Sequence, residues 1–244
     1  LNALLILDQG HIAPQAMTGS WAGAMGQVQF MPSTFLRYAV DFDGDGRHDI
    51  WNTLPDIFGS AANYLKNLGW DDSKTWGREV RLPADFDWRL ADLKRPRALA
   101  DWQAAGVRRT DGRDLPRVDI EGAVLLPAGH QGPAFLVYRN FHAILSWNRS
   151  LFYAISVGHL ADRIAGNGPL AAVPPAEERP LSRQEVEEMQ TRLITLGFDP
   201  GSPDGIIGAQ TRQAVRVFQA SAQLPADGYP SFEVLEALRQ VGGG

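Results

Sequence analysis

The sequence predicts a mainly α protein of the α+β class: a helical domain with a small mixed α/β insertion, followed by a three-helix C-terminal module. Three observations predict it. Apolar residues recur at helical spacing up to about residue 76, short apolar runs alternate with turn residues from about 77 to 139, and helical spacing returns after a proline-rich segment. With 244 residues and 44% hydrophobic content, the chain can bury more than one core.

The first part of the chain is predicted to be helical. Residues 1–10 are typical of the last turns of a helix that ends in glycine. A second helix is expected to begin at Pro32, because proline suits the first helical position. A third is expected over 56–68 with Asp56 as N-cap, and its buried stripe is predicted to be Phe58, Ala61, Ala62 and Leu65.

The middle of the chain mixes strand and helix signals. Short apolar runs at 79–82, 122–126 and 134–138 lie between prolines, glycines and aspartates, which predicts strands joined by turns. Helical periodicity is weak over 90–106 and stronger over 140–163. We therefore expect one domain over 1–165, with its strand-rich subdomain at about 77–139.

A linker and a separate module complete the chain. Residues 166–181 contain four prolines together with glycine and alanine, which favours an interdomain linker. Ser182 and Glu185 have the spacing of a capping box at the start of a helix. Three short helices over 182–241 offer only a small core, so this module should be modestly stable alone.

Composition excludes several classes of function. The net charge of −5 lacks the basic excess of a protein that binds nucleic acid or an anionic membrane. The absence of cysteine excludes disulfides and thiolate metal sites. No apolar run approaches the ~20 residues of a membrane span, and no signal peptide is visible.

An acidic loop over 41–52 has the ligand spacing of an EF-hand. Aspartates occupy loop positions 1, 3, 5 and 9, glycine occupies position 6, and position 7 would contribute the Arg47 carbonyl. Asn52 replaces the usual closing glutamate. The alternative is an acidic turn held by its own hydrogen bonds without a metal. The candidate side-chain ligands of Ca²⁺ within the loop are Asp41, Asp43 and Asp45.

The run GSWAGAMGQVQFMPS at 19–33 is the most informative segment. Five of its first eight residues are glycine or alanine, which allows a close approach either of another helix or of a ligand. The order of residues resembles the signature of the membrane-bound lytic transglycosylase B family, whose members cleave the glycan strands of bacterial peptidoglycan. The resemblance covers roughly 1–165 and implies a lysozyme-like helical catalytic domain.

By this resemblance, a few polar and aromatic side chains would line the sugar subsites. Amide, hydroxyl and aromatic groups suit N-acetyl groups and the apolar face of a sugar. Each residue alone is also compatible with simple packing, as are Met25 and Phe30, and Trp21 and Trp147 could either stack on sugars or fill gaps. The implied substrate-binding residues are Ser20, Gln29, Tyr64, Asn148 and Tyr153.

The family's general acid/base is a glutamate upstream of the signature, and this chain has none there. Its first glutamate is Glu79, far downstream and in another context. We therefore assign no catalytic residue, expect the acid to lie upstream of Leu1, and expect the chain as given to bind glycan without cleaving it. The family reaction cuts the MurNAc–GlcNAc β-1,4 bond and leaves 1,6-anhydro-MurNAc ends, with no cofactor in the chemistry.

The C-terminal module resembles the peptidoglycan-binding domain type 1 over 182–241. The order DGxxG-xxTRxAVxxFQ from Asp204 to Gln219 is intact. A generic three-helix module is the alternative that apolar spacing alone would leave open. The candidate wall-binding residues are Asp204, Gly205 and Arg212.

The transglycosylase resemblance also bears on the metal, the partner and the compartment. Some relatives close a calcium loop with a slightly later aspartate, for which Asp56 is the matching position. The expected partner is the peptidoglycan glycan strand, the expected compartment is the periplasm or cell envelope, and we expect a monomer. Two alternatives remain: a non-catalytic, calcium-dependent wall-binding protein, and a hydrolytic muramidase, which would need a second carboxylate in the cleft.

Overall fold

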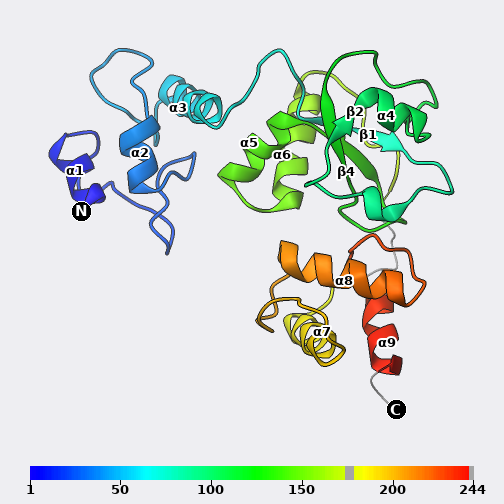
Figure 1. The fold of residues 1–244 in the computed structure, drawn as a ribbon. Helices are drawn as coiled ribbons and strands as arrows, with labels where there is room; N and C mark the ends of the chain where they lie inside the picture. Colours follow the sequence, from blue (N-terminus) through cyan, green and yellow to red (C-terminus); the bar gives the residue numbers. More distant parts are fainter. Residues whose placement is uncertain (174–178, 242–244) are drawn as a thin grey trace. The chain divides into compact units, whose positions relative to one another are not determined.

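The computed structural model describes residues 1–173 and 179–241, and it is mostly helical with one small sheet (Figure 1), as the sequence predicts. The chain divides into two compact units. The first consists of residues 1–74 and 142–148, and the second of 75–141 and the chain from 149 onward. Among the described residues, none of the helices combines the length and the apolar character that a membrane crossing requires.

The first unit surrounds a small apolar core. Its elements are α1 (Asn2–Asp8), α2 (Pro32–Tyr38) and α3 (Leu54–Asn67), together with the last residues of α5 (Arg139–Trp147). Pro32 is the first residue of α2, as expected from its locked φ. The buried side chains at the centre of this unit are Ile6, Met25, Phe30, Phe35 and Ile50.

The predicted phase of α3 is wrong. The helix begins at Leu54 after Thr53, and Asp56 is a buried residue of its first turn and not the N-cap. The predicted buried stripe is also misplaced, because Phe58 is 67% exposed and Ala62 lies on the surface.

Hydrogen bonds to the end of α2 and to the loop that follows it explain the true phase of α3. The Asp56 carboxylate accepts the Phe42 N–H (2.7 Å), the Ser60 hydroxyl accepts the Val40 N–H (3.0 Å), and the Asn63 amide donates to the Tyr38 carbonyl (2.8 Å). These three helix positions lie on one face because they are spaced at i, i+4 and i+7. A polar stripe that satisfies the loop backbone therefore turns inward.

The second unit contains an antiparallel five-stranded sheet in the order β2-β4-β5-β1-β3. The three predicted strands are confirmed as β1, β4 and β5, whereas only the end of the weak 90–106 signal is an α-helix, α4 (Leu99–Ala104). Trp102 of α4 is fully buried and donates its indole N–H to the Gly122 carbonyl. The strands are β1 (Gly77–Arg81), β2 (Arg97–Ala98), β3 (Arg108–Arg109), β4 (Glu121–Leu125) and β5 (Ala134–Val137).

The helical stretch predicted over 140–163 is two helices, α5 and α6 (Leu151–Ile164). The break is local, because the Ser150 hydroxyl accepts the Tyr153 N–H and caps α6. Helix α6 packs on Trp76, where Gly158 leaves room for the indole ring, and the indole N–H donates to Asp162 (2.9 Å).

The three C-terminal helices are α7 (Arg183–Thr195), α8 (Ala209–Ser221) and α9 (Phe232–Val241). Both hydrogen bonds of the predicted Ser182–Glu185 capping box are present. Part of the predicted linker, 174–178, lies outside the described residues. Within its described part, the N–H groups of Ala171 and Ala172 donate to the Glu79 carboxylate on β1.

An ion-pair network in this module predicts acid sensitivity. Hydrogen bonds from Arg239 and then Arg192 lower the pKa of Glu188 from 4.5 to about 2. A lowered folded-state pKa stabilises the fold above the ordinary pKa, and this contribution is lost as pH falls toward 2. We expect Glu188→Gln to melt below wild type at pH 7 and to converge with it near pH 2 in pH-dependent melting curves. Glu187→Gln is the control, because Glu187 pairs with the exposed Arg183, and parallel pH profiles for wild type and Glu188→Gln would contradict the assignment.

Candidate functional site

The glycine-rich run forms a narrow, internally bonded loop in the first unit. The Gly23 N–H donates to the Ser20 carbonyl (2.8 Å), which closes a tight turn. Met25 and Phe30 exchange two backbone hydrogen bonds (2.8 and 3.0 Å) and bring the two sides of the loop together. Met25 and Phe30 are themselves buried, so for these two residues the packing interpretation is confirmed.

Two predicted substrate residues, Ser20 and Gln29, help to hold this loop. The Ser20 hydroxyl accepts the Ala24 N–H (3.1 Å), and the Gln29 side-chain amide donates to the Gly26 carbonyl (2.8 Å). Gln29 also has a φ of +52°, which is uncommon for a residue with a side chain. Both residues are exposed, so they can contact a ligand while they shape the loop.

Gly26 is the position where the loop most needs glycine. Its φ is +65°, and a Cβ there would lie 2.6 Å from Ile50 Cγ1. We expect Gly26→Ala to destabilise the first unit by about 2 kcal/mol, because it adds backbone strain to a clash in the core. Gly23→Ala is the control, since Gly23 has a similar φ (+87°) and open space. Equal melting temperatures for the two variants would show that the clash is relieved.

Tyr64 lies in an aromatic group beneath the loop. Its ring centroid is 5.3 Å from that of Phe30, 4.9 Å from that of Tyr38 and 5.0 Å from that of Trp147. Desolvation raises the pKa of Tyr64, with a smaller contribution from Tyr38. The phenol therefore stays neutral at physiological pH and offers a hydroxyl that can donate a hydrogen bond.

The last two predicted substrate residues lie around the break between α5 and α6. Asn148 belongs to the first unit, as do Ser20, Gln29 and Tyr64, and its N–H donates to the Ile144 carbonyl. Tyr153 belongs to the second unit and is 37% exposed on α6. The substrate role of all five residues stays a prediction.

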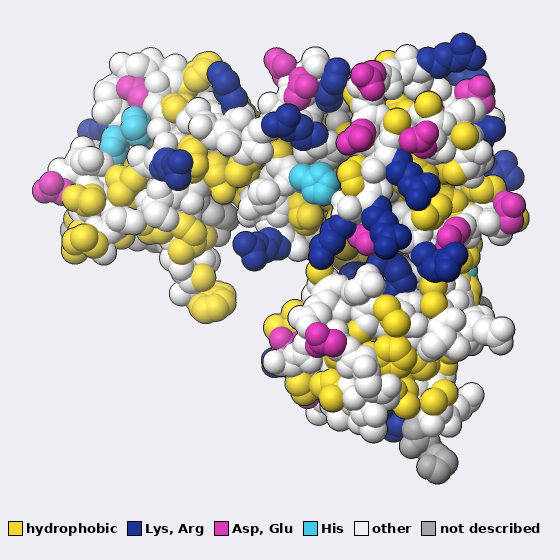
Figure 2. Space-filling model, in the orientation of Figure 1, with side chains coloured by type: hydrophobic (Ala, Val, Ile, Leu, Met, Phe, Trp, Pro, Cys, Tyr) yellow, Lys and Arg dark blue, Asp and Glu magenta, His cyan; other side chains and the backbone are white. Residues whose placement is uncertain are grey.

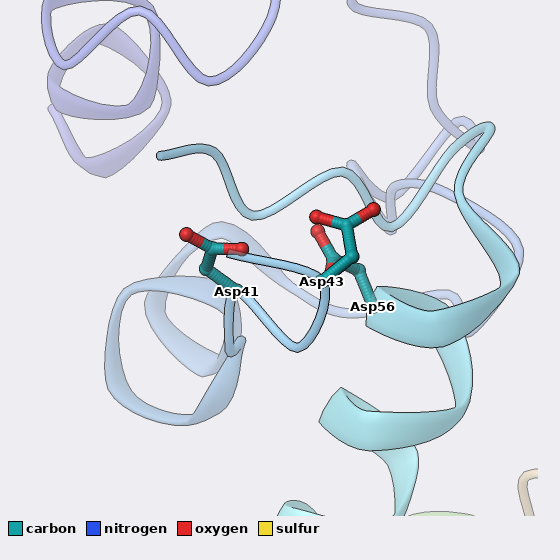
Figure 3. Close-up of side chains that lie close together, drawn as sticks. All are labelled: Asp41, Asp43 and Asp56. Carbon is teal, nitrogen blue, oxygen red and sulfur yellow. The ribbon is translucent and has the colours of Figure 1, made fainter. Parts of the chain in front are cut away.

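The acidic loop gathers three carboxylates (Figure 3). Oxygens of Asp41, Asp43 and Asp56 lie within 4.8 Å of one another, and Asp56 comes from α3. Asp45, another predicted calcium ligand, is not part of this carboxylate group, and its carboxylate accepts the Arg47 N–H (2.8 Å). The role of the Arg47 carbonyl as a ligand stays a prediction. The three oxygen ligands are of the hard type that Ca²⁺ prefers.

Backbone N–H groups hold the loop in shape around these carboxylates. Asp41 accepts the N–H groups of Gly44, Asp45 and Gly46, and Asp56 accepts those of Phe42 and Asp49. These bonds lower the pKa of Asp41, with the Gly46 N–H as the largest cause. The pKa of Asp43 is raised instead, by desolvation and then by the neighbouring acids. The arrangement concentrates negative charge where a cation would relieve repulsion.

In the C-terminal module, Asp204 and Gly205 organise a turn. The Asp204 carboxylate accepts the Ile206 N–H (2.9 Å), and the Gly205 N–H donates to the side-chain carbonyl of the buried Gln190 (3.0 Å). Arg212 is half-buried on α8, and desolvation lowers its pKa. These contacts give Asp204 and Gly205 a structural role, and wall binding by the three residues stays a prediction.

Sequence reasoning missed a junction between the module and the sheet. The buried Asp227 carboxylate accepts a hydrogen bond from the backbone N–H of His130 (2.8 Å). The same carboxylate oxygen lies 2.9 Å from Nδ1 of the His130 ring. Arg216 of α8 donates to the Ala91 carbonyl (2.8 Å). A cavity of about 640 Å³ lies beside this junction. The only local sequence signal at this junction is the Asp-Gly pair at 227–228, which is typical of a turn. It does not indicate that Asp227 binds His130, ninety-seven residues away.

Comparison with known proteins decides the family. A family described as "Transglycosylase SLT domain" matches residues 1–162, and one described as "Putative peptidoglycan binding domain" matches residues 182–238. The chain belongs to the SLT transglycosylase family. This lytic transglycosylase homologue carries its peptidoglycan-binding domain after the SLT domain.

Individual relatives agree with this assignment. The chain is 34% identical, over 167 residues, to membrane-bound lytic murein transglycosylase B of Escherichia coli K12; the match covers 66% of this chain and 44% of that protein. It superposes on Pseudomonas aeruginosa SltB3, solved with NAG-anhNAM-pentapeptide, with a TM-score of 0.93 and 51% identity over 98% of this chain. Escherichia coli Slt35 in complex with calcium gives a TM-score of 0.54 and 30% identity over 67% of this chain.

The chain is shorter than these relatives. It spans 64% of the SltB3 chain and 51% of the Slt35 chain. The activity of a whole relative is therefore a proposal for this chain.

Proposed function

We propose that this chain is the glycan- and wall-binding part of a peptidoglycan lytic transglycosylase of the bacterial periplasm or cell envelope. The observation that carries the proposal is the similarity to SltB3 over 98% of this chain, since that relative was solved with a NAG-anhNAM-pentapeptide. A second SltB3 structure, with NAG-NAM-pentapeptide, is 50% identical to this chain. An anhydro-sugar ligand supports a reaction that leaves 1,6-anhydro-MurNAc ends.

The proposed reaction needs one carboxylic acid. The acid protonates the glycosidic oxygen between MurNAc and GlcNAc, and the resulting carboxylate then takes the proton of the C6 hydroxyl. The C6 oxygen of MurNAc attacks C1 of the same MurNAc residue. The glycosidic bond breaks, a 1,6-anhydro ring forms and no water is consumed. In this chain, Ser20, Gln29, Tyr64, Asn148 and Tyr153 would orient the two sugars.

We propose further that residues 1–244 bind glycan without cleaving it. The first unit contains aspartates but no glutamate. Its acidic-loop aspartates are engaged by backbone N–H groups, and Asp71 accepts from Ser73. The hydrogen bonds named for the acidic-loop carboxylates all lie within residues 41–56.

Calcium is the proposed structural ligand of the acidic loop. The close approach of Asp41, Asp43 and Asp56 fits a hard divalent cation, and Slt35 was solved in complex with calcium. Asp45 and the Arg47 carbonyl complete the proposed ligand set. The ion would join the loop to the first turn of α3, and no step of the reaction passes through it.

The test is incubation of the chain with purified peptidoglycan, followed by sedimentation and mass spectrometry of the supernatant. We expect the protein in the pellet and no released anhydromuropeptides. Soluble products lighter by one water than hydrolysis products would show that an acid within 1–244 is active. Ordinary reducing-end products would instead support a hydrolytic muramidase, and protein that stays in the supernatant would contradict wall binding altogether.

A calcium-dependent wall-binding protein without catalysis is the second candidate, favoured by the three-carboxylate group. Where the natural protein has residues before Leu1, a chain extended by those residues separates the two candidates. Gain of anhydro products favours the transglycosylase, and binding that depends on calcium without any gain of activity favours the alternative.

A further inference from the structure

We propose that the indole of Trp21 is a stacking platform for the apolar face of an uncharged sugar ring in the glycan strand. This assignment rests on the proposed function and adds a subsite to it.

The structure separates two tryptophans that the sequence left equivalent. Trp147 is partly buried and packs against the core of the first unit, with its ring centroid 5.0 Å from that of Tyr64 and 5.6 Å from that of Phe30. Trp21 is 102% exposed, the largest value among the exposed large apolar side chains. Trp147 is therefore partly covered by its neighbours, whereas the Trp21 ring is free to meet a ligand on both faces.

The backbone holds Trp21 in a defined place. Trp21 and Ala22 are the central residues of the turn that the Gly23 N–H closes onto the Ser20 carbonyl. The Ser20 N–H donates to the Ala24 carbonyl (2.8 Å), and the Ser20 hydroxyl accepts the Ala24 N–H. A Cβ on Gly19 would lie 2.9 Å from the Ala24 carbonyl oxygen, so this approach requires glycine. A preorganised turn lowers the entropic cost of binding through its tip.

The chemistry of the loop indicates which ligand it suits. Residues 19–31 contain no charged side chain, so the loop offers no counter-charge to the carboxylates of stem peptides. The loop before α2 extends away from the helices of its unit and ends in hydrophobic side chains (Figures 1 and 2). The fold gains no described contact from an indole at this tip, where small polar residues are the usual choice. An aromatic face beside exposed amides and hydroxyls is a surface that complements a neutral pyranose.

The experiment uses the full 244-residue chain and chitotetraose as the uncharged glycan probe. Isothermal titration calorimetry measures chitotetraose binding by the wild type and the variants, and iodide quenching of tryptophan fluorescence reports whether the probe covers Trp21 in the wild type. We expect chitotetraose to protect the wild-type protein from iodide. We expect Trp21→Ala to weaken chitotetraose binding about tenfold, a typical loss for truncating an aromatic binding residue, and Trp21→Phe to recover most of it. Because Trp21 is fully exposed, both variants should have the same melting temperature as the wild type.

Phe58→Ala is the matched control, since it removes an aromatic ring of 67% exposure from the same unit. Undiminished chitotetraose binding by Trp21→Ala overturns the inference. So does a wild-type protein that pellets with peptidoglycan while chitotetraose leaves iodide quenching unchanged. A wild-type protein that binds neither peptidoglycan nor chitotetraose overturns the proposed function itself.

Discussion

Asp227→Ala is expected to undock the C-terminal module from the sheet and to cost about 3 to 5 kcal/mol, the usual range for breaking a buried charged contact. The Asp227 carboxylate is almost fully buried and accepts four contacts. Two come from His130 between β4 and β5, and two come from Gln219 and Tyr229 of the module. Truncation to alanine removes the acceptor from these donors, which are buried or partly buried.

Differential scanning calorimetry measures this effect. We expect the transition of the module to separate from that of the sheet and to fall on the order of 10 °C. Asp199→Ala is the matched control, because the Asp199 carboxylate accepts Gln210 and Gly201 on the exposed surface of the same module. A calorimetric trace for Asp227→Ala that coincides with that of Asp199→Ala would show that Asp227 does not hold the junction.

Calcium is expected to stabilise the first unit by about 2.7 kcal/mol when its free concentration is a hundredfold above the dissociation constant. The change that tests this best is Asp43→Asn. Asp43 is an exposed member of the carboxylate group, and its one described hydrogen bond, from the Asp45 N–H, is long at 3.3 Å. Asp56 is a poorer choice, because it is buried and accepts two backbone N–H groups, so its loss would damage the fold.

Two melting curves, in calcium and in chelator, decide the calcium prediction. We expect Asp43→Asn to lose the calcium-dependent rise and, in chelator, to melt no lower than wild type, because it removes one of several repelling charges. Asp72→Asn, outside the loop, should keep the full rise. Identical wild-type curves in calcium and chelator would show that the loop is only an acidic turn.

Local signals predicted those elements whose boundaries depend on neighbouring residues. The Ser182–Glu185 capping box and Pro32 at the start of α2 act within a few residues, and the structure contains both. The phase of α3 could not be predicted in this way. Its inward face is polar because Asp56 and Ser60 bind the backbone of residues 40–49, and hydrophobic periodicity carries no information on such contacts.

The candidate site likewise has features that the sequence predicted and features that only the structure shows. The order of residues in 19–33 indicated the family and a sugar-binding loop, but it could not rank Trp21 against Trp147. Burial ranks them, since the Trp147 ring is partly buried against the core and the Trp21 ring is fully exposed. The spacing of the acidic loop predicted Asp41 and Asp43, whereas Asp56 entered only through resemblance, because the turn that brings α3 back to the loop is a tertiary feature.

The sequence by itself determined the fold class, the family and the order of the two domains, because these depend on local periodicity and on motifs read along the chain. Only the tertiary structure decided which acids meet, which tryptophan is free and how Asp227 joins the module to the sheet. These are contacts between residues far apart in the chain. Their formation depends on how buried polar groups find partners when the elements pack, and no short window of sequence contains both partners.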